Sequence, residues 1–271
     1  MPAIDLGQFL DRLERSNLLT RDDLEALHAE IAPVRDVVQV EPLGRKLVRR
    51  GQLTGWQVQR LLSGRDDFQL GNYRLLDLLG RGGMGTVFKA EHVVLGRVVA
   101  VKVMARQLVK SSKHVARFQQ EIQAVAAIDH PNVVRAIDAE SDGDSHFLVM
   151  EYVEGHSLQD LIVDDGPRSY RDTADYIRQS AHGLSHAHEA GLVHRDIKPA
   201  NLLVDLEGVV KILDLGLARF FEETDENPIT LRHDEKVLGT ADYLHPNRLS
   251  TATRWMPGRT FTVSVARCIS C

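Results

Sequence analysis

The sequence predicts an α+β protein, with a strand-rich lobe, a helical lobe after it, and a small helical segment in front. Three observations predict this order: apolar side chains recur at helical spacing in residues 1–70, strand patterns begin at Tyr73, and a long helix is expected at 173–190. Strands and helices that occupy separate stretches of a chain are typical of the α+β class. The length of 271 residues allows one or two domains.

Composition and charge give few indications of a partner. The chain has 33 basic and 38 acidic residues, which gives no reason to expect nucleic acid or an anionic membrane as a partner. No run of about 20 apolar residues occurs, so we expect no membrane segment, and the N-terminus lacks the pattern of a signal peptide. Both cysteines, Cys268 and Cys271, lie near the end. The body of the chain therefore lacks a disulfide framework, which favours a cytoplasmic location.

Residues 1–70 contain two similar halves. The matching positions are Phe9/Leu43, Leu13/Leu47, Leu19/Leu53, Thr20/Thr54, Leu24/Val58 and Leu27/Leu61. Thr20 and Thr54 stand where helix N-caps belong. The pattern predicts two helix–turn–helix units with a break around Pro33 and a linker at 63–67. Its role stays open between an accessory helical segment and a specific docking module.

A glycine-rich stretch follows the first predicted strand, Tyr73–Leu79. Its sequence, GRGGMG at 80–85, leads into the strand pattern TVFKA at 86–90. A dinucleotide-binding loop would instead open a helix, so a dinucleotide-binding oxidoreductase is excluded. We expect a strand–turn–strand hairpin whose backbone N–H groups can close over phosphates, because glycine has no Cβ to block the approach.

The next strand, 98–103, carries Lys102 among apolar residues. An isolated lysine in such a strand is commonly an edge residue whose ammonium reaches water. A charge in a partly buried cleft needs a partner instead. The helix predicted at 115–128 supplies Glu121 beside its apolar stripe, and an acid on the core side of a helix is costly unless paired. We therefore predict a Lys102–Glu121 ion pair.

Two further strands are predicted at 133–139 and 146–152, joined by a turn at 141–144, and a hairpin is predicted at 202–212. Between them, the long helix expected at 173–190 is followed by the sequence HRDIKPAN at 194–201. Asp196, Lys198 and Asn201 can share one cleft only if this stretch is a tight loop. Pro199 supports a loop because it disfavours helix at the residue before it.

This stretch resembles the catalytic loop of protein kinases, H-R-D-x-K-P-x-N, in its serine/threonine form. The glycine hairpin, the V-A-V-K strand around Lys102 and the D-L-G sequence at Asp214 resemble further parts of that family. The segment GQLTGWQVQRLLSG at 51–64 resembles those of bacterial, planctomycete-type serine/threonine kinases. The resemblance implies a two-lobed protein kinase fold over 71–244, with an N-lobe at 71–153 and a partial C-lobe at 154–244.

The resemblance also implies roles for individual residues. Asp196 would accept the proton of the substrate hydroxyl, Lys198 would neutralise the transferred phosphoryl group, and Asn201 and Asp214 would hold Mg²⁺. His194 would be structural rather than a base. Met150 would stand at the adenine pocket. The residues that would bind ATP are Leu79, Gly80, Arg81, Gly82, Gly83, Met84, Gly85, Thr86, Val87, Ala100, Lys102, Glu121, Glu151 and Val153.

Residues 217–240 resemble an activation segment. Thr224 and Thr230 are candidate phosphorylation sites, since a phosphate there could bond to Arg195. Thr240 would contact Asp196 and Lys198. In the D-L-G sequence Leu215 replaces the usual Phe, and a large apolar side chain can fill the same pocket.

The resemblance stops after Leu244. Adding one nucleotide after that codon, with suitable third bases, converts residues 244–271 into LAPEQALNSHTVDARADIYSLGCTLHFL. That string contains A-P-E and D-I-Y-S-L-G, which resemble the kinase continuation. We therefore expect 245–271 to be an atypical, out-of-frame tail, and reading the coding DNA at this codon tests it.

The function implied is ATP- and Mg²⁺-dependent phosphorylation of Ser/Thr hydroxyls in protein substrates, with self-association for autophosphorylation. The alternative is a truncated, inactive fragment that binds nucleotide or a partner. Phosphate transfer that depends on Asp196 discriminates between them.

Overall fold

The computed structural model describes residues 4–82, 85–105, 122–194 and 196–215. These residues form two compact units: one holds the described chain up to Ala105 together with Glu140–Phe147, and the other holds the rest. The first unit runs across the boundary expected at residue 70, because the helical segment and the strands after it share contacts. Among the described residues, no helix is long and apolar enough to cross a lipid bilayer.

The helical segment has the two predicted helix–turn–helix units. Its helices are α1 (Leu6–Arg15), α2 (Arg21–Ile31), α3 (Val40–Arg49) and α4 (Gly55–Leu62), with the 3₁₀ helix η1 (Ala32–Val37) at the expected break. Thr20 and Thr54 are both N-caps, accepting from the backbone of Asp23 and Gln57. The apolar residues of the repeat are buried together, apart from Leu24, which is partly buried. The repeat seen in the sequence is therefore a repeat of structure.

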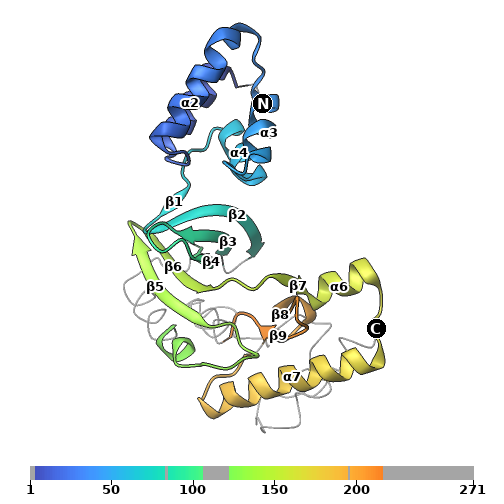
Figure 1. Cartoon of the computed structure of the whole chain (residues 1–271). Coiled ribbons are helices and arrows are strands. Elements are labelled where there is room, and N and C mark those ends of the chain that lie inside the picture. The colour runs from blue at the N-terminus through green and yellow to red at the C-terminus, as the bar shows by residue number, and fades with distance from the viewer. Residues whose placement is uncertain (1–3, 83–84, 106–121, 195, 216–271) are drawn as a thin grey trace, which may run out of the picture. The chain divides into compact units, whose positions relative to one another are not determined.

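The strand-rich part of the first unit is a curled antiparallel sheet (Figure 1). Strands β1 (Gln69–Leu70), β2 (Tyr73–Gly82), β3 (Gly85–His92) and β4 (Val98–Met104) lie side by side in this order. The predicted glycine hairpin is confirmed, because Gly82 and Gly85 face each other at the end of β2 and β3. Strands β5 (Ala136–Asp142) and β6 (Ser145–Glu151) are joined at Gly143, whose φ of 54° suits glycine.

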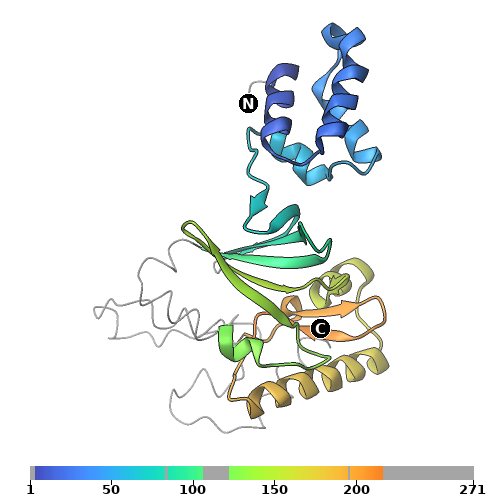
Figure 2. The ribbon, with the colours of Figure 1, turned by 60° about the vertical axis from the view of Figure 1, so that its left-hand side comes forward.

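The second unit contains α6 (Leu158–Asp165), α7 (Tyr170–Glu189), the 3₁₀ turn η3 (Pro199–Asn201) and a small sheet. Strands β7 (Gly155–Ser157), β8 (Leu202–Asp205) and β9 (Val210–Ile212) form that sheet in this order (Figure 2). Leu184 of α7 and the strand residues Leu202 and Ile212 share one buried apolar cluster. Leu215 is 3% exposed and belongs to the same cluster, so leucine does fill the pocket expected for it.

Strand β7 is an element that the sequence did not predict. The strand pairs with β8, and a Cβ on Gly155 would lie 2.1 Å from the backbone oxygen of Val204. Only glycine permits this approach. Of the helix predicted at 115–128, residues 122–126 are helical and the part before them lies outside the described residues.

Candidate active site

The loop between α7 and β8 is as tight as its sequence predicts. Lys198 is extended, with φ −154° and ψ 162°, and the next three residues make the turn η3. The backbone N–H of Asn201 donates to the oxygen of Lys198 at 2.9 Å. Pro199 accounts for this geometry, because its ring excludes the helical conformation at Lys198 and its fixed φ suits the first position of the turn.

The turn brings the three predicted polar residues together. Lys198 Nζ lies 2.8 Å from Asp196 Oδ2, and Asn201 Nδ2 donates to the Asp196 backbone oxygen at 2.7 Å and to Oδ2 at 3.3 Å. The Asp196 and Lys198 side chains are 21% and 27% exposed. The carboxylate is thus held in place while its surface stays accessible.

The buried side chain of His194 holds the loop through contacts on both ring nitrogens. Its ring is 2% exposed, Nε2 lies 2.7 Å from the Leu213 oxygen, and Nδ1 lies 3.3 Å from the Asp196 nitrogen. A carbonyl oxygen can only accept and an N–H can only donate, so the ring is neutral with its proton on Nε2. Burial lowers the pKa of His194, against the opposing effects of the Leu213 carbonyl, Asp214 and Asp196. The structure thus confirms a structural role for His194.

Asn201 and Asp214 are connected through the neighbouring backbone. The Leu213 N–H donates to the Asn201 oxygen at 2.9 Å, which places the predicted metal ligand Asp214 next to the catalytic loop. Asp214 has φ 55°, a left-handed conformation that aspartate tolerates better than most residues. Because Asn201 Nδ2 faces Asp196, its amide oxygen points elsewhere. An amide oxygen and a carboxylate fit a hard divalent cation, and Mg²⁺ takes few protein ligands when phosphates supply others.

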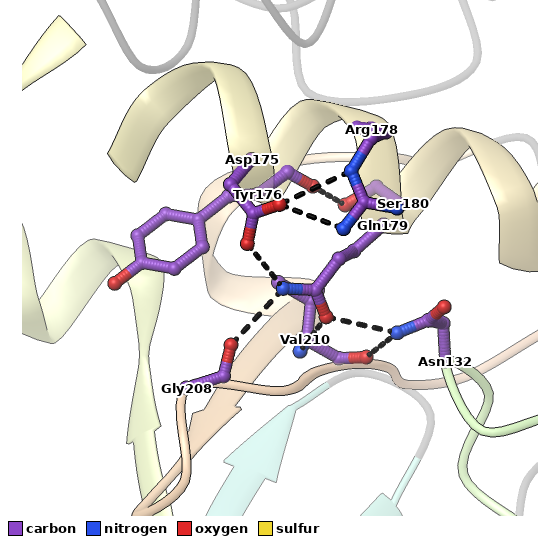
Figure 3. A network of polar contacts seen from close by, with 8 residues as sticks. All are labelled: Asn132, Asp175, Tyr176, Arg178, Gln179, Ser180, Gly208 and Val210. Atoms are coloured by element: carbon purple, nitrogen blue, oxygen red, sulfur yellow. Dashed lines mark hydrogen bonds and ion pairs between the residues drawn. The ribbon is translucent and has the colours of Figure 1, made fainter. Parts of the chain in front are cut away.

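A polar network centred on Gln179 holds the hairpin that follows this loop, and sequence reasoning missed it (Figure 3). Gln179 Oε1 accepts from Asn132 Nδ2 at 3.0 Å and from the Val210 N–H at 2.8 Å. Its Nε2 donates to Asp175 Oδ2 at 2.8 Å and to the Gly208 oxygen at 3.1 Å. Every hydrogen-bonding position of the amide is used, so the network joins α7 to the hairpin that follows the catalytic loop. No spacing in the sequence connects Gln179 with Asn132, Gly208 and Val210, which lie 29 to 47 residues away.

The glycines of the hairpin differ in what a side chain would meet at each position. A Cβ on Gly85, where φ is 144°, would lie 2.0 Å from the Val103 oxygen, so packing demands glycine there. A Cβ on Gly80 or Gly82 would meet no described atom within 4 Å. Packing against the described residues therefore does not explain these two glycines.

The other predicted ATP-binding residues of the first unit line the same strands. Leu79 is 47% exposed although it is apolar, Ala100 is buried, and Lys102 is 2% exposed in β4 opposite Val87 of β3. Arg81 and Thr86 face each other near the end of the hairpin. The β2–β3 hairpin and the adjacent strand β4 thus carry an exposed apolar side chain, Leu79, and a buried cation, Lys102.

Met150, predicted at the adenine pocket, and the predicted ATP-binding residues Glu151 and Val153 belong to the second unit. Met150 is buried at the end of β6. The Glu151 side chain accepts from Lys211 Nζ at 2.9 Å and from the Arg135 N–H at 3.0 Å. Its carboxylate thus fixes local structure, and recognition of adenine by Glu151 and Val153 would use the backbone.

Several predicted residues lie outside the described residues. These are Gly83, Met84, Glu121, Arg195, Thr224, Thr230 and Thr240, together with the tail from 245. The Lys102–Glu121 ion pair and the phosphorylation sites accordingly stay predictions.

Comparisons with known proteins agree with this site. Serine/threonine-protein kinase PrkC of Bacillus subtilis is 36% identical over 178 residues, covering 66% of this chain and 27% of the relative. Probable serine/threonine-protein kinase PknB of Bifidobacterium longum is 39% identical over 187 residues, covering 66% and 27%. The chain thus spans about a quarter of the length of these relatives.

Solved structures give the same result. The crystal structure of the Mycobacterium tuberculosis PknI kinase domain is 26% identical, with a TM-score of 0.50, covering 55% of this chain and 60% of that one. The protein kinase domain pattern matches residues 73–259, which includes part of the tail after Leu244. The polar cluster on Asp196, the glycine hairpin and this match lead to one conclusion: the chain belongs to the protein kinase domain family.

Proposed function

We propose that the chain is an ATP- and Mg²⁺-dependent protein kinase that phosphorylates Ser and Thr hydroxyls of proteins. The observation that carries the proposal is the contact of Lys198 Nζ and Asn201 Nδ2 with the same carboxylate oxygen of Asp196. Lysine two positions after the aspartate is the serine/threonine form of the family's loop. The names of the relatives, which are serine/threonine-protein kinases, support the same choice of acceptor.

The described residues account for the steps of the transfer. Asp196 accepts the proton of the acceptor hydroxyl as its oxygen bonds to the γ-phosphorus, while the bond from that phosphorus to the bridging oxygen of ATP breaks. Lys198 offsets negative charge on the group in transit. Bound Mg²⁺ would neutralise the phosphates, with Asn201 and Asp214 as its protein ligands. Gly80, Gly82 and Lys102 would also hold the phosphates.

Transfer of labelled phosphate from ATP to a Ser/Thr-containing protein tests the proposal. The full chain is compared with Asp196→Asn, and with Asp138→Asn as a matched loss of an exposed carboxylate on β5. General-base catalysis contributes about 10²–10⁴-fold, so Asp196→Asn should lose that much rate and still bind nucleotide. Asp138→Asn should keep full rate. Nucleotide binding without any transfer by the full chain would overturn the kinase proposal in favour of a binding fragment.

Regulation and location complete the proposal. We place the chain in the cytoplasm and propose autophosphorylation of Thr224 or Thr230 between copies. Phosphorylation of an Asp196→Asn copy by an unaltered copy tests whether one molecule phosphorylates another. Unchanged activity after replacing both threonines by alanine would contradict their regulatory role.

A further inference from the structure

Strand β2, which leads into the glycine hairpin, contains two bulges. Leu75 faces Ala90 and Asp77 faces Lys89, so Leu76 is an extra residue; Leu79 is extra in the same way between Leu78 and Gly80. A bulge bends a strand and turns the residues after it in a new direction. The curl of β2 is clear in both views (Figures 1 and 2). The direction of the glycine hairpin therefore depends on how these bulges are held.

The first bulge is held from outside the sheet by the start of α4. Gln57 Nε2 donates to the Leu75 oxygen at 2.8 Å, and Thr54 Oγ1 donates to the Leu76 oxygen at 2.5 Å. The Leu75 N–H donates to the Phe68 oxygen at 2.7 Å. Gln57 is 3% exposed, so water does not compete for its hydrogen bond. Backbone groups that the bulge withdraws from the strand ladder thus find partners in the helical segment.

The same two side chains also cap α4. Thr54 Oγ1 accepts from the Gln57 N–H at 3.1 Å, and Gln57 Oε1 accepts from the Thr54 N–H at 2.9 Å. This reciprocal capping box leaves the hydroxyl hydrogen of Thr54 and the amide hydrogens of Gln57 for the strand. Trp56 lies between them and packs on Phe88 of β3, with ring centroids 5.7 Å apart. The N-terminus of α4 therefore contacts both strands of the glycine hairpin: Thr54 and Gln57 bond to β2, and Trp56 packs on β3.

We propose that Thr54 and Gln57 are positioning residues for nucleotide, acting through the first bulge of β2 on the glycine hairpin at 80–85. The inference rests on the proposed ATP-binding function of that hairpin. It assigns the helical segment a role as part of the nucleotide-binding sheet. A segment that only added stability would change unfolding without changing the affinity for nucleotide.

The internal repeat supplies a matched control. Thr20 caps α2 as Thr54 caps α4, and Oγ1 of Thr20 contacts Asp23 alone among the described residues. Thr54→Ala and Thr20→Ala therefore each remove one N-cap, but only the first removes a contact with β2. Gln57→Glu is a second variant: a carboxylate oxygen can still accept from the Thr54 N–H, whereas the donor to the Leu75 oxygen is lost.

The experiment measures the dissociation constant of a non-hydrolysable ATP analogue for the full chain, the three variants above and Thr54→Ser. Thr54→Ala and Gln57→Glu should each bind up to about fivefold more weakly, since one net hydrogen bond is worth about 1 kcal/mol. KM for ATP should rise with little change in kcat, and Thr54→Ser should restore affinity. Thr20→Ala should bind like the unaltered chain. Equal affinities for Thr54→Ala and Thr20→Ala would overturn the proposal.

A second readout does not depend on nucleotide. Amide hydrogen exchange at 76–92 should be faster in Thr54→Ala than in Thr20→Ala, because the bulge is released. If the unaltered chain binds no nucleotide, the proposed function fails while this exchange difference still decides on the positioning role. Identical exchange in the two variants would contradict it.

Discussion

Asp196 and His194 show how single residues define the chemistry of the loop. The Asp196 carboxylate is oriented by one cation and one amide, and its backbone N–H is held by His194 Nδ1. The proton of the His194 ring is fixed on Nε2 by the Leu213 carbonyl. A protonated ring would lose its acceptor at Nδ1, so the geometry of the loop requires neutral histidine.

We predict that the protein loses stability as pH falls below about 6.5, the ordinary pKa of histidine. Burial lowers the pKa of His194, and the pKa of His130 is lowered by burial and then by His186, His182 and Lys211. Below this pH the unfolded chain binds more protons than the folded protein does. The free energy of unfolding therefore has its full value above this pH and declines as the pH falls below it. Urea unfolding at pH 7.5 and 5.5 measures this. His130→Asn, which keeps an acceptor for the Asn132 N–H, should show a smaller loss; an equal loss would contradict the assignment.

Asn201 is expected to couple metal binding to the position of the carboxylate. Asn201→Ala removes a proposed Mg²⁺ ligand and two hydrogen bonds to Asp196. We expect the Mg²⁺ concentration for half-maximal phosphate transfer to rise about 10–100-fold, as for loss of groups that position metal ligands. A Mg²⁺ titration of transfer rate checks this. An unchanged Mg²⁺ requirement would remove Asn201 from the metal site.

At the scale of elements, Gln179 shows how a helix can hold the hairpin that follows the active loop. Helix α7 carries the amide, and β9 and the turn before it supply two of its four partners. Asn132, which is 8% exposed, also donates to the Val210 oxygen at 2.9 Å. Asn132 and Val210 are buried and need partners, so the network specifies one register of α7 against the hairpin.

Gln179→Ala should lower the free energy of unfolding by about 1–3 kcal/mol, because the buried Val210 N–H loses its partner and the buried Asn132 amide loses one of its two. Arg178→Ala, at the next position, is the control: that side chain is 61% exposed and forms a surface ion pair with Asp175, so little change is expected. Urea unfolding of both variants gives the comparison. Similar losses in the two would show that the network of Figure 3 contributes no more than a surface pair.

At the scale of the whole molecule, the helical segment and the glycine hairpin belong to one compact unit. Trp56 packs edge-on against Phe68, at 5.8 Å between ring centroids, and also contacts Phe88. The aromatic contacts and the hydrogen bonds from α4 to β2 connect the two parts. A unit connected in this way unfolds cooperatively when its contacts are shared.

We predict that the helical segment and the sheet unfold together. In a Trp255→Phe chain, Trp56 is the only tryptophan, so its fluorescence reports the contact of the segment with the sheet. Its transition in urea should coincide with the loss of hydrogen-exchange protection in β3. Separate midpoints would mean that the segment is an independent domain.

The sequence by itself determined features whose physical basis is local. Apolar spacing and the threonine caps gave both helix–turn–helix units, the glycine pattern gave the β2–β3 hairpin, and Pro199 gave the tight loop around Asp196. Each depends on residues a few positions apart, where periodicity and backbone restriction act directly.

The tertiary structure alone decided the contacts between distant segments. The hydrogen bond from Gln57 to the Leu75 oxygen, the three bonds that join Gln179 to Asn132, Gly208 and Val210, and the close approach of Gly155 to Val204 follow no spacing in the chain. A buried amide takes whichever partner the fold brings within reach, so its role is fixed only when the segments pack. The sequence therefore determined which chemistry is present, and packing decided what holds it in place.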